Sequence, residues 1–130
     1  DLMFPGGGIE HGEAHDAALA RELREECGAE LVAVGPLLGE TREYRAAREP
    51  DYDAYCIRSS YYLCRVGEDW SAPRPQPYEI RLGFTPGWFP LAEALQTNKT
   101  QLAGSCPQWT ARETRVLAEL HRWQASGLLT

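Results

Sequence analysis

The spacing of apolar residues predicts a helix in the first third of this chain. Between residues 15 and 27, Leu19, Leu23 and Cys27 recur every four positions, which places them on one apolar helix face. Gly28 follows directly, and glycine readily adopts the left-handed backbone conformation that ends many helices. We therefore expect a helix over residues 15–27 that ends at Gly28.

The rest of the chain alternates between strand-like and helix-like patterns. The predicted elements are the end of a strand over 2–4, extended segments over 31–34 and 37–44 interrupted by Gly35-Pro36, a strand over 55–66, a short strand over 82–89, a helix over 90–96 that begins at Pro90, and a helix over 107–125 that ends near Gly127. Polar loops are expected over 45–53, 67–77 and 97–104. In the strand over 55–66, Cys56 and Cys64 share one face if no bulge intervenes. This mixture predicts an α/β or α+β domain.

Composition narrows the class of protein. A chain of 130 residues with 43% hydrophobic and 25% charged residues fits one globular domain over 1–130. The net charge of −6 argues against a general nucleic-acid binder, and every apolar run is too short for a membrane span. The four cysteines form no CxxC pair, so we expect reduced thiols in a cytoplasmic protein rather than disulfides or a zinc site.

The stretch from Gly7 to Ala29 carries the candidate chemistry. A glycine-rich loop leads into the predicted helix, where Glu22, Glu25 and Glu26 are spaced to share one face. Like charges at this spacing destabilise a helix unless a cation balances them. Carboxylate oxygens are ligands for magnesium, manganese or calcium, so the pattern indicates a divalent metal site.

The same stretch resembles the Nudix box, G-x5-E-x7-R-E-U-x-E-E-x-G-U, in which U is a bulky aliphatic residue. The matching positions are Gly7, Glu13, Arg21, Glu22, Leu23, Glu25, Glu26 and Gly28. Ala29 departs from the pattern because it is apolar but small. The resemblance implies a single Nudix hydrolase domain, with an α/β/α sandwich around a mixed, curved sheet. Its N-terminal strands are expected in roughly 30–40 residues that precede the chain.

The resemblance also implies an activity and roles for the residues of the box. Members of this family hydrolyse a nucleoside diphosphate linked to another moiety, with Mg²⁺ or Mn²⁺. The partner expected is therefore a small nucleotide, without a stable nucleic-acid complex or a membrane, and a homodimer remains open. By similarity, the metal would be held by Glu22, Glu25, Glu26 and the carbonyl of Gly7. Arg21 would orient a carboxylate in the catalytic site, while Glu13 and Gly28 would support the loop and the helix end.

Two features of the mechanism stay open at this level. The general base is either Glu22 or Glu79, since relatives often carry an acidic residue in a later loop. For the substrate, Tyr44 and Arg58 are the candidates: Tyr44 lies near a tyrosine that marks some dinucleoside-polyphosphate hydrolases of this family. Phosphate contacts from the other arginines of this region are also considered, namely Arg42, Arg45 and Arg48.

Two alternatives to an enzyme belong to other functional classes. One is a non-hydrolytic ligand-binding or regulatory module on the same fold. The other is a structural domain stabilised by calcium or magnesium. The complete set of charged residues in the box favours the enzyme, because a binding module has little need for three clustered carboxylates.

Overall fold

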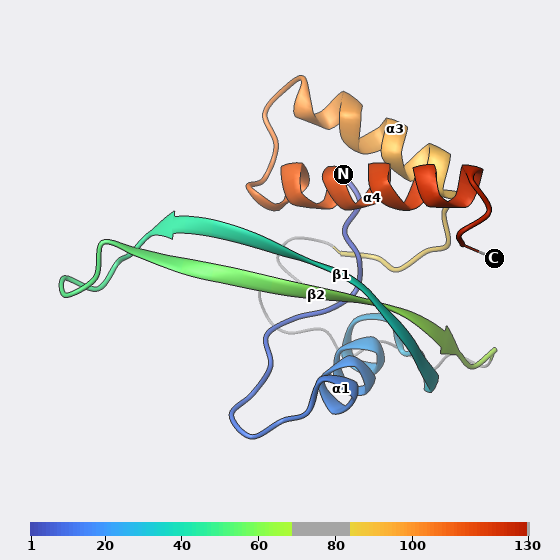
Figure 1. Cartoon of the computed structure of the whole chain (residues 1–130), viewed down its shortest axis with the longest axis horizontal. Helices are drawn as coiled ribbons and strands as arrows, with labels where there is room; N and C mark the ends of the chain where they lie inside the picture. The colour runs from blue at the N-terminus through green and yellow to red at the C-terminus, as the bar shows by residue number, and fades with distance from the viewer. Residues whose placement is uncertain (69–83, 130) are drawn as a thin grey trace. The chain divides into compact units, whose positions relative to one another are not determined.

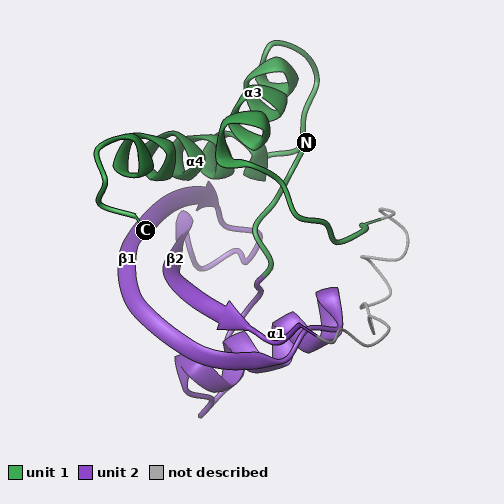
Figure 2. Ribbon diagram, turned by 90° about the vertical axis from the view of Figure 1, so that its right-hand side faces the viewer, with its two compact units in different colours: residues 1–5, 79–130 green, residues 6–78 purple. Residues whose placement is uncertain are grey.

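The computed structural model describes residues 1–68 and 84–129 of the chain. Its elements are helix α1 (His15–Cys27), strands β1 (Leu31–Ala46) and β2 (Ala54–Val66), and helices α3 (Leu91–Leu102) and α4 (Trp109–Ala125), as Figure 1 shows. This mixture of helices and strands confirms the α/β class predicted from the sequence. The chain divides into two compact units, drawn in different colours in Figure 2. One unit joins residues 1–5 to α3 and α4, and the other begins at Gly6 and contains α1, β1 and β2.

Helix α1 has the bounds that the apolar spacing predicted. Gly28 ends it with φ of 68°, and its N–H donates to the carbonyl of Arg24. The next N–H, that of Ala29, donates to the carbonyl of Leu23, so the two bonds satisfy carbonyls that the helix end would otherwise leave unpaired. Ala29 is only 1% exposed, so the small residue at the last position of the box is fully enclosed.

Strands β1 and β2 form a long, twisted, two-stranded antiparallel ribbon (Figure 1). The predicted interruption at Gly35-Pro36 is wrong, because β1 runs unbroken through both residues. The irregularity lies instead in the pairing of the two strands. The register between β1 and β2 shifts at three places, and at each of them β1 has one extra residue, as it does between Val34 and Leu37. Since β2 itself stays regular, Cys56 and Cys64 share one face of it, and all four cysteines of the chain are free thiols.

In the other unit, α3 and α4 pack around a small apolar core. The buried members of this core are Ala94, Leu95 and Leu117, against which Leu2 and Phe4 also pack. The strand end predicted over 2–4 is wrong: Leu2 instead pairs its backbone with the amide of Asn98, through bonds of 2.7 and 2.9 Å. Asn98 is 0% exposed, so its side chain replaces the strand partner that the backbone of Leu2 lacks.

The helices of this unit also differ from their predicted bounds. Pro90 caps α3, which continues to Leu102, so the loop predicted over 97–104 is wrong along most of its length. Helix α4 begins at Trp109, two residues later than predicted. The described part of the predicted strand over 82–89, residues 84–89, forms no strand. Among the described helices, none has both the length and the apolar character that crossing a bilayer requires.

The irregular part of the ribbon generates a first prediction. A Cβ added at Gly35 would lie 2.5 Å from the carbonyl oxygen of Leu63 on β2, so Gly35→Ala must push the two backbones apart. We expect this substitution to lower the free energy of unfolding by about 1–3 kcal/mol in urea titrations. Gly39→Ala on the same strand is the matched control, because nothing lies within 4 Å of its added Cβ. Equal stability of the two variants would contradict the close approach.

Candidate functional site

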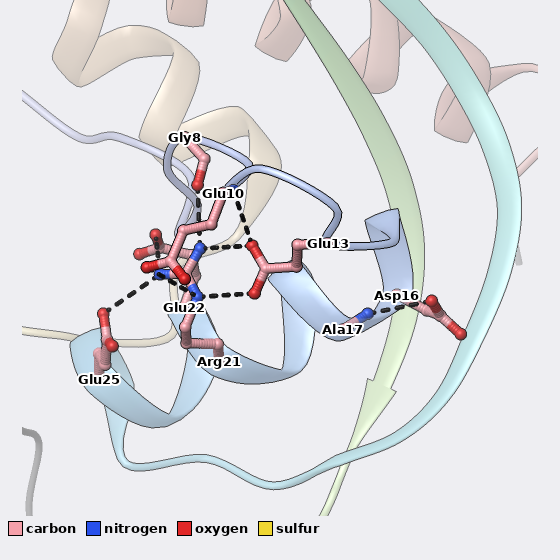
Figure 3. A network of polar contacts seen from close by, with 8 residues as sticks. All are labelled: Gly8, Glu10, Glu13, Asp16, Ala17, Arg21, Glu22 and Glu25. Atoms are coloured by element: carbon pink, nitrogen blue, oxygen red, sulfur yellow. Dashed lines mark hydrogen bonds and ion pairs between the residues drawn. The ribbon is translucent and has the colours of Figure 1, made fainter.

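Arg21 of α1 is the centre of a polar network that joins the helix to the preceding loop (Figure 3). Its guanidinium binds Glu13 with two parallel hydrogen bonds, from Nε to Oε2 and from Nη2 to Oε1, each 2.9 Å long. These bonds, together with a bond from the backbone N–H of Glu10, lower the pKa of Glu13 to about 2. In turn, Glu13 raises the pKa of Arg21 above its usual range. Both groups therefore stay ionised throughout the neutral pH range.

The remaining donors of Arg21 reach the other parts of the box. Nη1 donates to Oε1 of Glu22 at 2.8 Å and lies 3.6 Å from Oε2 of Glu25. Nη2 also donates to the carbonyl of Gly8 at 2.9 Å. One planar cation thus ties two carboxylates of the helix to the main chain of the glycine-rich loop, as Figure 3 shows.

The carboxylate of Glu22 is buried against the backbone of Gly7. A Cβ added at Gly7 would lie only 2.3 Å from Oε1 of Glu22, so this position leaves no room for a side chain. Close by in the chain, the N–H of Gly6 donates to Oε1 of Glu26 at 3.3 Å. The loop and the carboxylates of α1 therefore meet along main-chain atoms, which explains why this contact requires glycine at Gly7.

The chemistry of this donor set fits a divalent cation of the magnesium type, since it consists of carboxylate oxygens beside an exposed loop backbone. Over residues 1–68 and 84–129, however, no three His, Cys, Asp or Glu side chains gather as a group that could hold a metal ion. The guanidinium of Arg21 instead contacts two of these carboxylates, at 2.8 Å from Oε1 of Glu22 and 3.6 Å from Oε2 of Glu25. The residues thus fit the ion by donor type, while in the arrangement described here the Arg21 guanidinium offsets part of their negative charge.

The other predicted site residues lie elsewhere. Gly28 ends α1, as described above. Tyr44 projects from β1 with 74% of its surface exposed, and Arg58 lies on β2 with its guanidinium 3.2 Å from Oε1 of Glu40. Glu79, the second candidate for the general base, lies outside the residues that the structure describes.

The structure adds contacts that the sequence analysis missed. The carbonyl of Gly8 carries no side-chain signal, so only the fold could reveal that it accepts a bond from Arg21. Glu40 was also missed, although its spacing from Arg42 places both on one face of β1. Its contact with Arg58 depends on the register between β1 and β2, which the sequence pattern alone does not define.

The bidentate pair of Arg21 and Glu13 predicts a dependence of stability on pH. The pKa of Glu13 is lowered from 4.5 to about 2 on folding, so its contribution is complete above about pH 4.5 and is lost as the pH falls toward 2. We expect Glu13→Gln to be less stable than the wild type at pH 7 in urea titrations. The gap between the two proteins should narrow steadily between pH 4.5 and 2.5. A gap of constant size across this range would contradict the pairing.

Comparison with known proteins identifies the family of the chain. The chain matches the NUDIX domain family over residues 1–125. It is 34% identical over 104 residues to a protein named RNA pyrophosphohydrolase from Saccharophagus degradans; the match covers 72% of this chain and 61% of that protein's length. No solved structure matches the chain significantly. Because the family match extends over nearly the whole chain, and the box residues form one connected network, the chain belongs to the Nudix family.

Proposed function

We propose that this chain hydrolyses the pyrophosphate bond of nucleoside diphosphate derivatives with the help of Mg²⁺ or Mn²⁺. The observation that carries the proposal is the placement of Glu22, which lies against the main chain of Gly7 and is held there by Arg21. Membership of the Nudix family and the name of the relative support the same reaction class. Because the match covers only 61% of the relative's length, the activity itself is part of the proposal.

In this proposal each residue of the box has a separate task. Glu22, Glu25, Glu26 and the carbonyl of Gly7 would hold the metal ion. A metal ion held by these residues would screen the charge of the pyrophosphate and make a water molecule more acidic. Arg21 positions Glu22 and anchors the loop through Gly8.

The lowered pKa of Glu13 bears on the choice of general base. A carboxylate with a pKa of about 2 is a poor proton acceptor at neutral pH, so Glu13 serves as the anchor of Arg21. The two candidates for the base remain Glu22 and Glu79. Of these, Glu22 is fixed in place by a hydrogen bond of 2.8 Å that its Oε1 accepts from Arg21.

The substrate is proposed to be a small nucleotide that contacts the ribbon. Tyr44 presents an exposed ring on which a base can stack, and Arg58 presents an exposed guanidinium for a phosphate. RNA belongs among the substrates to be tested, because the relative is named an RNA pyrophosphohydrolase. The net charge of −6 favours a small nucleotide over a long polyanion.

One observation favours the alternative of a non-hydrolytic binding module. In the described arrangement Arg21 contacts both Glu22 and Glu25, so an internal cation already offsets part of the charge of these carboxylates. A binding module would retain ligand affinity and show no turnover, which the following experiment detects directly.

The test of the function is a substrate panel with Mg²⁺ or Mn²⁺, comprising ADP-ribose, dinucleoside polyphosphates, nucleoside triphosphates and 5′-triphosphorylated RNA. We expect metal-dependent release of a phosphorylated product from at least one of them, and its loss on addition of EDTA. Glu26→Gln should reduce kcat by about a hundredfold or more, since it removes one proposed ligand charge from the metal.

Glu30→Gln is the matched control for this substitution, because Glu30 is an exposed glutamate just beyond the box. It should retain the kcat of the wild type. Thermal melting of both variants checks that the fold is intact. Near-normal turnover in Glu26→Gln would contradict the metal assignment, and no turnover on any substrate with either ion would contradict hydrolysis.

The contact between Gly7 and Glu22 generates a further prediction. Gly7→Ala must displace the Glu22 carboxylate, because the new methyl group would occupy its position. We expect kcat to fall by about tenfold or more, with little change in melting temperature, since the loop is exposed. Gly8→Ala is the control, because its added Cβ meets nothing within 4 Å and the carbonyl that binds Arg21 is retained. The same kcat in both variants would overturn the role of this contact.

A further inference from the structure

Two arginines lie directly opposite each other on the ribbon. Arg42 of β1 and Arg58 of β2 are cross-strand partners in the antiparallel register. Their side chains are 59% and 60% exposed. Directly opposed side chains of an antiparallel pair begin only about 5 Å apart, and like charges in this position are destabilising. The pair is therefore an unfavourable arrangement that needs an anion between or beside the two guanidinium groups.

Glu40 supplies part of that negative charge from within the chain. Its carboxylate lies 3.2 Å from Nη2 of Arg58 and 4.0 Å from Nη2 of Arg42, and it accepts a bond of 3.4 Å from the hydroxyl of Ser60. The contact with Arg58 lowers the pKa of Glu40, so the carboxylate is ionised at neutral pH. One carboxylate beside two guanidinium groups still leaves one positive charge on this surface.

The opposite face of the same strand shows the contrast. Arg45 is only 24% exposed and is paired with Glu43 on its own face at 3.1 Å. Arg42 and Arg58 thus differ from Arg45 in being exposed and incompletely balanced. The face of the ribbon that carries Glu40 therefore also carries two exposed arginines whose charge this carboxylate balances only in part.

That face of β2 also leads toward the helix that carries the box. Arg58, Ser60 and Tyr62 alternate along the regular strand, so their side chains share one side of it. The hydroxyl of Tyr62 forms a hydrogen bond of 2.8 Å with Nδ1 of His15, the first residue of α1. The arginine pair and α1 are accordingly associated with the same face of β2.

We propose that Arg42 and Arg58 together bind a phosphate group of the nucleotide substrate, and that Glu40 holds their guanidinium groups until the phosphate displaces it. This inference rests on the proposed function and extends it, because it adds Arg42 to the substrate site and assigns Glu40 as an internal competitor. Two guanidinium forks match the oxygens of one phosphate, and a phosphate dianion balances both positive charges, whereas the carboxylate balances one.

Binding without turnover gives the sharpest test. Calorimetric titrations with AMP and with adenosine are carried out in EDTA, where no metal ion can bring the phosphate to the box. We expect Arg42→Gln and Arg58→Gln each to weaken AMP binding about fivefold or more and to leave adenosine binding unchanged. Glu40→Gln should tighten AMP binding several-fold, because it removes the competing charge. Increasing salt should weaken AMP binding in the wild type.

Arg45→Gln is the matched control, because it removes an arginine from the opposite face of β1 and should leave AMP binding unchanged. Thermal melting identifies any variant that fails to fold, and Arg42→Lys and Arg58→Lys then replace it, since lysine keeps the charge but not the fork. Unchanged AMP affinity in the arginine variants, or weaker AMP binding in Glu40→Gln, would overturn the inference.

The two proposals fail in different ways. Turnover on the substrate panel with an unchanged KM in Arg42→Gln and Arg58→Gln would overturn the phosphate site and leave the hydrolytic function in place. Arginine-dependent AMP binding without turnover on any substrate would support the phosphate site and overturn hydrolysis. An increased KM with an unchanged kcat supports both.

Discussion

The guanidinium of Arg21 is the interaction on which the candidate site depends. Without it, the negative charges of Glu13, Glu22 and Glu25 would lie close together beside one short loop. Their mutual repulsion would then destabilise this part of the structure. With it, the carboxylates become acceptors of one planar cation, and the carbonyl of Gly8 joins them. Because the fork of arginine fixes the direction of each bond, the loop and the helix acquire a defined relative placement. This rigidity is what a catalytic carboxylate requires.

The ribbon balances charge by a different arrangement. Around Arg21 the anions outnumber the cation and are partly buried, so that the network holds main chain in place. Around Glu40 the cations outnumber the anion and are exposed, so that each ion pair is weak and readily exchanged with solvent ions. The first arrangement suits positioning, and the second suits binding of a mobile anion. In the proposed function, the cluster around Arg21 thus positions the carboxylates, and the cluster around Glu40 binds the substrate phosphate.

Glycine has a different role at each end of the box. At Gly7 the absence of a side chain admits the carboxylate of Glu22, while at Gly28 a left-handed backbone conformation ends α1. Ala29 then lies fully buried beside this turn, which agrees with a small residue at a position where the family pattern has a bulky one. The lack of room at Gly7 and the turn at Gly28 therefore restrict which residues the two ends of the box can carry.

The sequence by itself determined α1 and the membership of its carboxylates in one box, because both follow from spacings within a single helix. It misjudged the segments whose partners are distant in the chain. Leu2 pairs with Asn98, and burial of Asn98 extends α3 beyond the bounds that local polarity suggested. Likewise, only the register of two strands could place Arg42 opposite Arg58. Local periodicity and capping are encoded in neighbouring residues, whereas these contacts depend on tertiary packing and on cross-strand alignment.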